Sequence, residues 1–322
     1  MKIAVNGRLV DGEKAVVSVY DHGFLYGIGC FETFRTYDGA PFLISEHLER
    51  LREGCREMGI RLRPGLLEPD GRDLRPLIAA LLEANGLKDA YFRLSVSAGI
   101  GELGLASGDC TDPTVVLYVK PLPPSDGDGE ARGKPLQLLN LRRNSPEGPV
   151  RRKSFHFLNN WLAKRELALC TWLDDPGAEG LLLDGRGRLA EGIVSSLFFV
   201  RDGVLRTPAL ETGILPGITR KAVLALAGLR GIAAEEGLYG VGELVRAEEM
   251  FVTNSVRELV PIRAVYDPEG RILWESPDGA GPVTAALLDD YRKWARKGVD
   301  TVDEIAGGTV QEDGLGAPRP HL

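Results

Sequence analysis

Three short segments carry residue types that together can hold and use a cofactor. Lys153 lies in RRKSFHFLNNWLAK (151–164), where a basic stretch, expected at the end of a strand, leads into a helix-like pattern. Glu191 lies in LAEG, and GILPGITR (213–220) is a turn that opens a helix. A lysine can form a Schiff base, a carboxylate can hold a pyridinium, and a helix N-terminus can hold a phosphate. A pyridoxal 5'-phosphate (PLP) site needs these three parts.

Each of these residues also has a plain structural interpretation, as a solvated lysine, a surface glutamate and an ordinary helix start. For Lys153, the apolar residues that follow favour desolvation, and the neighbouring Arg151 and Arg152 favour the neutral, nucleophilic amine. Glu191 is expected in a hairpin that leads into an apolar strand. A buried carboxylate there needs a cationic partner, and a protonated pyridine nitrogen would supply one.

Polar groups near the predicted helix start could hold a phosphate. The backbone amides of Ile218 and Thr219, with the Thr219 hydroxyl, would form a cradle. The sequence Thr253-Asn254-Ser255, directly after a predicted strand, could form a second one. Arg50 could close the phosphate from the other side, or it could be an ordinary arginine on a helix surface.

Composition and charge bound the class of protein. The chain has 322 residues, of which 43% are hydrophobic, enough for two domains with full cores. Its formal charge of −7 argues against nucleic acid or an anionic membrane as the main partner, because both attract concentrated positive charge. We therefore expect a small-molecule substrate, and local arginines could bind an anionic one.

Cysteine usage and hydropathy point to a cytoplasmic protein. The four cysteines are scattered without metal-ligand spacing, so we expect neither a metal site nor a disulfide framework. The first residues lack the long apolar stretch of a signal peptide, and no apolar run is long enough to cross a membrane.

Hydrophobic patterning predicts two α+β or α/β domains, because strands and helices interleave without a βαβ rhythm. The Pro-, Gly- and Asp-rich stretch 121–134 reads as a linker between a small domain (1–120) and a larger one (135–297), and 298–322 reads as a loose tail. Strands are predicted at 2–6, 15–19, 31–37, 91–96, 114–119, 136–141, 181–183, 197–200 and 250–252. Helices are predicted at 46–58, 74–85, 155–169, 218–229 and 283–297.

The sequence GIGELG at 99–104 matches the glycine pattern G-x-G-x-x-G. A dinucleotide site also requires a helix directly after this pattern, and the following residues, LASGDCTDP, do not form one. We therefore interpret it as a glycine-rich loop on the rim of a pocket.

Several ordered motifs between residues 2 and 266 resemble the fold-type IV (class IV) family of PLP-dependent aminotransferases. This family includes branched-chain aminotransferases, D-amino-acid aminotransferases and 4-amino-4-deoxychorismate lyases. The resemblance implies a two-domain α/β (α+β) fold, with a small N-terminal domain and a larger PLP domain, usually in a homodimer. The motifs are YGIGCFETFRTYDG (26–39), EHLERL (46–51), RRKSFHFLNNWLAKREL (151–167), LAEGIVSSLFFV (189–200), GILPGITR (213–220) and EEMFVTNSVRELVPI (248–262).

The resemblance implies roles for residues that match the family motifs. Lys153 falls on the Schiff-base lysine, Glu191 on the acid that contacts the pyridine nitrogen, and Leu215 on a side chain beside the cofactor ring. The phosphate contacts fall on Arg50, Ile218, Thr219 and Ser255. The substrate pocket falls on Phe31, Thr33, Arg35 and Arg93.

The F-E-T-x-R form of the first motif most resembles aminodeoxychorismate lyases. This implies a step of folate biosynthesis that yields 4-aminobenzoate and pyruvate. Lys153 would move the proton, Thr33 would assist, and Arg35 or Arg93 would hold a carboxylate. Two alternatives stay open: a class IV transaminase of branched-chain L-amino acids or D-amino acids, and a protein that binds PLP without catalysis.

Overall fold

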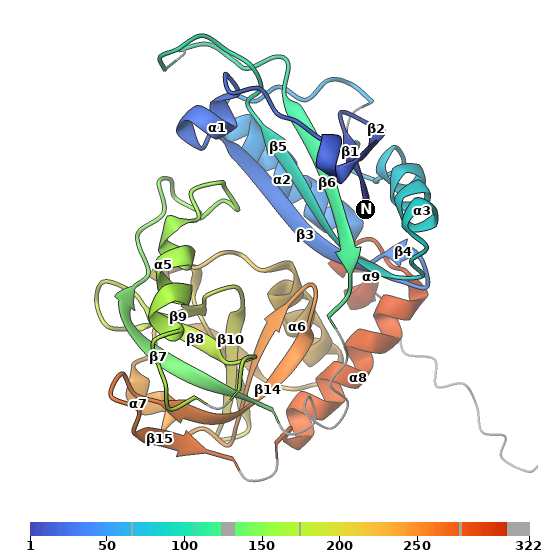
Figure 1. Ribbon diagram of the computed structural model, residues 1–322. Helices are drawn as coiled ribbons and strands as arrows, with labels where there is room; N and C mark the ends of the chain where they lie inside the picture. The colour runs from blue at the N-terminus through green and yellow to red at the C-terminus, as the bar shows by residue number, and fades with distance from the viewer. Residues whose placement is uncertain (66, 106, 124–132, 174, 277–278, 308–322) are drawn as a thin grey trace, which may run out of the picture.

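Two β-sheets, each covered by helices, make up the computed structural model (Figure 1). It describes residues 1–65, 67–105, 107–123, 133–173, 175–276 and 279–307. This arrangement confirms the predicted mixed α/β fold. Among the described residues, no helix combines the length and the apolar character needed to cross a membrane.

The first sheet is antiparallel throughout, with the strand order β2-β1-β6-β5-β3-β4. Apolar side chains from one face of β3 and β5 form a core with the amphipathic helices α2 and α3. The other face of β3 and β5 is left to contribute to the site. The elements are β1 (Lys2–Val5), β2 (Arg8–Asp11), the 3₁₀ turn η1 (Gly12–Lys14), α1 (His22–Tyr26), β3 (Gly29–Tyr37), β4 (Ala40–Pro41), α2 (Ile44–Glu57), α3 (Leu74–Asn85), β5 (Ala90–Ser97) and β6 (Thr114–Pro121).

The second sheet is mixed, with the order β12-β11-β10-β13-β14-β7-β8-β9, and β15 pairs with β14. β7 runs parallel to both β14 and β8, and the hairpin of β8 and β9 lies at one edge. Its strands are β7 (Lys134–Arg142), β8 (Glu179–Leu183), β9 (Leu189–Gly192), β10 (Ser196–Arg201), β11 (Val204–Pro208), β12 (Ala234–Gly237), β13 (Glu249–Asn254), β14 (Glu258–Tyr266) and β15 (Ile272–Glu275).

Helices cover the second sheet on both faces. α5 packs on β7 and β8, whereas α6, α8 and α9 share a buried cluster with β10, β13 and β14. The helices are α5 (Leu158–Leu167), η2 (Leu210–Thr212), α6 (Ile218–Leu229), α7 (Val241–Leu244), α8 (Pro282–Lys297) and α9 (Val302–Gly307).

Three of the predicted segments differ from the structure. Residues 15–19 form no strand, and Val16, Val17 and Val19 are exposed, so the β-branched run was misleading. The predicted linker begins and ends inside strands, since Pro121 ends β6 and Lys134 begins β7, and residues 124–132 lie outside the described residues.

The predicted loose tail is wrong in its first part. Residues 302–307 form α9, whose Val302 and Ile305 are buried in the cluster that contains α6. Val302 and Ile305 are three residues apart, which is the spacing of one helix face. The mostly polar composition of residues 298–322 as a whole conceals this pair. The rest of the predicted tail, 308–322, lies outside the described residues.

Candidate active site

The backbone of the Lys153 segment lies along β3, although this segment is not the strand end that its basic sequence predicted. The Phe31 amide donates to the Lys153 carbonyl (2.8 Å), and the Phe155 amide donates to the Gly29 carbonyl (2.9 Å). A Cβ on Gly29 would stand 2.5 Å from a ring carbon of Phe155, so only glycine permits this close approach. The segment between β7 and α5 is therefore joined to β3 at Lys153, whose Nζ lies 4.7 Å from the centre of the Phe31 ring.

The Lys153 amine is half-buried, and its surroundings favour the neutral form. Burial lowers the pKa of Lys153 to about 8, the cation of Arg50 adds to this effect, and Arg93 contributes less. The carboxylates of Glu32 and Glu191 act in the opposite direction. At neutral pH a useful fraction of the amine is therefore unprotonated.

The arginines next to Lys153 in sequence serve a different purpose from the one predicted. Arg151 donates to the Gly213 carbonyl (2.5 Å), and Arg152 donates to Glu53 on α2 (2.6 Å) and also pairs with Glu57. They fix the backbone directly before Lys153, whereas Arg50 and Arg93 supply the nearby positive charge.

Glu191 is buried on β9 and has two partners in the protein. Arg143, which follows β7, donates from Nε to Oε1 (2.7 Å), and the Leu215 amide donates to Oε2 (3.0 Å). Arg143 also donates to the side-chain oxygens of Asn159 (2.6 Å) and Asn160 (3.4 Å). The predicted need for a cationic partner is thus met by Arg143, which sequence reasoning missed.

The first turn of α6 offers unpaired donors. Its N-cap residue, Gly217, has no side chain, so the amides of Ile218 and Thr219 lack the side-chain cap that many helices use. The hydroxyls of Thr219 and Ser255 lie 3.3 Å apart at this point. Asn254 acts differently, because its Oδ1 accepts from the amides at positions 256 and 257 and so shapes the turn itself.

Arg50 reaches this turn from the other sheet. Its Nη1 donates to the Pro216 carbonyl (2.7 Å), directly before α6. Its Nε and Nη2 donate to the two oxygens of Glu32 on β3, each at 2.7 Å, and His47 contacts the same carboxylate at 2.7 Å. Burial alone would raise the pKa of Glu32, but Arg50 and His47 outweigh it and lower the pKa to about 2. This ion pair was missed, although Glu32 interrupts the apolar face of β3.

Phe31, Thr33 and Arg35 share the face of β3 that is directed away from α2. Thr33 lies opposite Arg93 on β5 in the antiparallel register. The Arg93 guanidinium stacks on Phe31, with Cζ 3.6 Å from the ring centre, and its Nε donates to Ser95 (3.2 Å). No acidic side chain pairs with Arg93 within the described part of the chain, and burial lowers its pKa.

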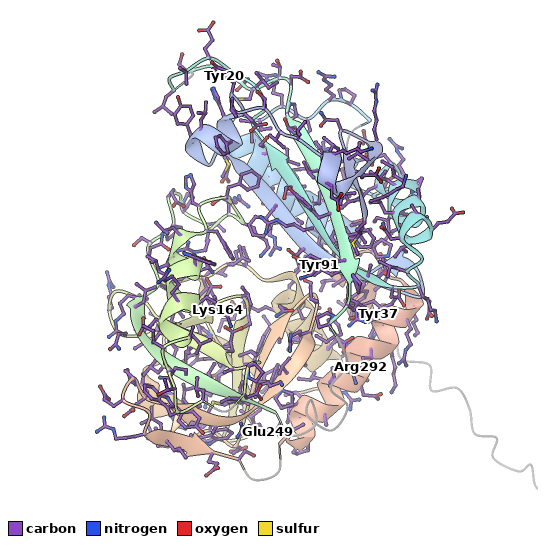
Figure 2. All side chains as sticks on the ribbon, viewed as in Figure 1. Tyr20, Tyr37, Tyr91, Lys164, Glu249 and Arg292 are labelled. Atoms are coloured by element: carbon purple, nitrogen blue, oxygen red, sulfur yellow. The ribbon has the colours of Figure 1, made fainter. Side chains whose placement is uncertain are left out.

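Arg35 differs from Arg93 because it is held between the sheets. Its Nη1 donates to the Val256 carbonyl (3.2 Å) and lies 3.6 Å from Glu258, which also accepts from Tyr37 (2.8 Å). Figure 2 shows Tyr37 and Tyr91 where the first sheet meets the second. The geometry therefore favours Arg93 over Arg35 as the cation that can meet a ligand.

The glycine-rich loop after β5 lines a separate hollow of about 430 Å³ with His22. The His22 ring contacts the Glu102 carbonyl at 2.9 Å, and a Cβ on Gly101 would collide with it. No helix follows the glycines in the described residues of this loop, in agreement with the expectation of a pocket rim.

Comparison with known proteins identifies the family. The profile of the family described as amino-transferase class IV matches residues 29–265, and the chain belongs to this family. It is 40% identical to the aminodeoxychorismate lyase of Bacillus subtilis (strain 168), over 90% of this chain and 94% of that protein. It is 36% identical to a putative branched-chain-amino-acid aminotransferase of Methanocaldococcus jannaschii, over 93% and 100% of the two chains.

A solved structure extends this similarity to the fold. The branched-chain amino acid aminotransferase of T.th., determined with pyridoxamine 5'-phosphate, is 27% identical and superposes with a TM-score of 0.77 over 92% of this chain and 94% of that one. The predicted fold-type IV architecture is confirmed.

The chain is a class IV enzyme with PLP as its cofactor, as predicted, and the side chains in place fit that group. An amine with a lowered pKa, a buried carboxylate and an uncapped helix start lie on elements that meet between the sheets. Lys153 would hold the aldehyde end, Glu191 the ring nitrogen, and the first turn of α6 the phosphate.

Proposed function

We propose that this enzyme is a 4-amino-4-deoxychorismate lyase, which releases 4-aminobenzoate and pyruvate. The observation that carries the choice of reaction is the 40% identity to the Bacillus subtilis lyase, which extends over nine-tenths of this chain. The F-E-T-x-R sequence at the centre of β3 supports the same choice.

The anion-binding capacity of the site supports this substrate. Arg93 is half-buried, has no acidic partner among the described side chains, and stacks on Phe31 beside Lys153. A cation in this position gains most from a carboxylate, which its planar guanidinium can bind through two parallel hydrogen bonds. The proposed substrate carries two carboxylates, and Arg93 would hold one of them.

The proposed mechanism assigns proton transfer to Lys153. When bound, PLP supplies an electron sink that makes the hydrogen on the amine-bearing carbon acidic. The neutral Nζ of Lys153 takes that proton, a contribution of about 10²–10⁴-fold for a well-placed base. Glu191, held by Arg143, would contact the ring nitrogen of the cofactor, and Thr33 lies on the face of β3 from which it could orient the substrate.

The reaction balances without a second reactant. The bond between the ring carbon and the ether oxygen breaks, and the ring becomes aromatic as the proton leaves the amine-bearing carbon. The departing enolpyruvyl group takes up one proton and becomes pyruvate. In this proposal Lys153 receives the first proton and returns one.

Transamination is the second candidate function. The 36% identity to the Methanocaldococcus jannaschii protein and the likeness to the T.th. aminotransferase favour it, and the same side chains serve both reactions. In this case Lys153 would take the proton from the amine-bearing carbon and return it at a second carbon, and PLP would supply the acceptor for the amino group as water releases the keto acid.

Two assays on the holoenzyme separate the candidates. With 4-amino-4-deoxychorismate, a lyase forms 4-aminobenzoate and pyruvate in equal amounts, and no keto acid is required. With D-alanine, L-leucine or L-glutamate alone, a lyase leaves the absorbance of bound PLP unchanged, whereas a transaminase converts it to the pyridoxamine form. Lys153→Ala should abolish turnover, and Lys164→Ala on α5 should retain it (Figure 2). Conversion by amino acids without formation of 4-aminobenzoate would overturn the lyase proposal.

We also propose a cytoplasmic homodimer. Apolar side chains at the start of α5 are exposed beside the Lys153 segment, namely Phe157, Leu158, Trp161 and Leu162. A second group is exposed on α1 and on the glycine-rich loop after β5, namely Phe24, Ile100 and Leu103. Surfaces of this kind on enzymes commonly mark contacts between subunits.

A further inference from the structure

Two buried side-chain polar atoms lack a hydrogen-bond partner among the described residues: Nε of Arg35 and Oγ1 of Thr253. Thr253 is only 2% exposed, at the end of β13. A buried hydroxyl without a partner destabilises a fold, and such atoms are rare in native proteins. The Thr253 hydroxyl therefore needs an explanation outside the protein's own hydrogen bonds.

The register of the sheet places this hydroxyl at the start of α6. Thr253 lies opposite Ser196 in the antiparallel pair of β10 and β13. Side chains alternate along a strand, so both residues share the face of Phe198 and Phe251, which pack in one cluster with α6. A Cβ on Gly217 would stand 2.7 Å from Ser196 Oγ, so this face meets the helix at its N-cap.

The backbone amides in the first turn of α6 have no side-chain hydrogen-bond acceptor. α6 is 12 residues long, and no side chain caps its N-terminal amides. Free amides and the helix dipole attract an anion, and a neutral hydroxyl can donate to the same anion. The unpaired helix start and the unpaired hydroxyl are independent observations that point to one ligand.

We propose that Thr253 is a further phosphate-binding residue, whose Oγ1–H donates to the phosphate of the cofactor beside the Thr219 and Ser255 hydroxyls. This inference rests on the proposed placement of the phosphate at α6, and it adds a donor from inside the sheet. In the absence of the cofactor the hydroxyl is a buried group without a partner, and the phosphate supplies its acceptor.

A buried threonine in the same sheet provides a matched control. Thr207 on β11 is also fully buried, but its Oγ1 donates to the Leu197 carbonyl (2.8 Å) and lies 3.3 Å from Arg220 Nε. Removing that hydroxyl breaks bonds of the fold itself. Thr207→Val should therefore destabilise the apoprotein, whereas Thr253→Val should not.

The test compares the binding of PLP and of pyridoxal, which lacks the phosphate, to the full-length apoprotein. For Thr253→Val we expect the Kd for PLP to rise by roughly tenfold or more, as for the loss of a hydrogen bond to a charged group, with the Kd for pyridoxal unchanged. Thr253→Ser keeps the donor and should retain most of the affinity for PLP. The thermal midpoint of Thr253→Val apoprotein should equal or exceed that of the wild type.

Two results would overturn the inference. One is an unchanged Kd for PLP in Thr253→Val; the other is a lower apoprotein midpoint with equal losses of affinity for PLP and pyridoxal, as for a structural hydroxyl. Neither result depends on turnover. If wild-type protein binds PLP but forms no 4-aminobenzoate, the proposed reaction fails and the assignment of Thr253 stands.

Discussion

Residues that are distant in sequence set the chemistry of single side chains in this site. Lys153 owes its lowered pKa to burial first and then to Arg50, which lies about a hundred positions earlier in the chain. Its neighbours Arg151 and Arg152 bind other groups. Sequence proximity therefore predicted an amine with a lowered pKa but the wrong source of positive charge.

This environment predicts how the apoprotein captures PLP as the pH changes. The pKa of Lys153 is lowered to about 8, so the protonated amine dominates below that pH and the reactive neutral amine above it. The rate of PLP attachment should rise about fivefold or more between pH 7 and pH 9 and then level off. Stopped-flow absorbance would measure this rate.

Two lysine variants test whether that pH profile reports the Lys153 amine. Lys164→Ala should follow the wild type, because Lys164 is exposed on α5. Lys153→Ala should form no covalent adduct, as judged by intact mass after borohydride treatment. A rate that continues to rise to pH 10 or above would show that the Lys153 amine has an ordinary pKa.

At the scale of elements, β3 joins the core to the site through its two faces. The predicted strand at 31–37 is confirmed as part of β3, and its period of two places Phe31, Thr33 and Arg35 on one side. Glu32 lies on the other face, where it pairs with Arg50 and His47 of α2. The alternation shows that a carboxylate points into the core, but it does not reveal which helix supplies the cation.

Removing the Glu32 charge should weaken this junction. In Glu32→Gln the partly buried Arg50 loses a fully buried ionic partner, a loss that typically costs about 3–5 kcal/mol. The pKa of Glu32 is about 2 in the folded protein, so in the wild type its contribution is complete above pH 4.5 and is lost as the pH falls towards 2. Urea unfolding at pH 7 and at pH 4 should show a smaller pH dependence in the variant.

A more exposed ion pair, between Glu57 of α2 and Arg152, provides the control for Glu32. Glu57 contacts Arg152 near the surface, and Glu57→Gln should change the free energy of unfolding by less than about 1 kcal/mol. If Glu32→Gln were equally mild, Glu32 would not be the anchor of Arg50. Lost affinity for PLP in Glu32→Gln would further tie this anchor to the phosphate.

At the scale of the whole molecule, the sequence was sufficient to predict the fold class. It was insufficient to predict the contacts between segments that are distant in the chain. Long periodic helices such as Leu74–Asn85 and Ile218–Leu229 have the predicted bounds, because their apolar stripes are continuous. The Arg143–Glu191 pair and the docking of α9 on α6 depend on tertiary packing between distant segments. No periodicity within one segment contains that information.

Single substitutions on the surface can test the proposed dimer. Trp161 on α5 is 60% exposed, and large aromatic residues at the centre of an interface often contribute about 2 kcal/mol or more to association. Trp161→Glu should therefore raise the dimer dissociation constant by roughly thirtyfold or more, which sedimentation velocity can measure. Ile272→Glu is the control, because Ile272 is also exposed but lies on β15, which Figure 1 shows below α5 at the edge of the molecule. A wild type that sediments at the 34.9 kDa of one chain would contradict the dimer, and equal masses for wild type and Trp161→Glu would exclude α5 from the interface.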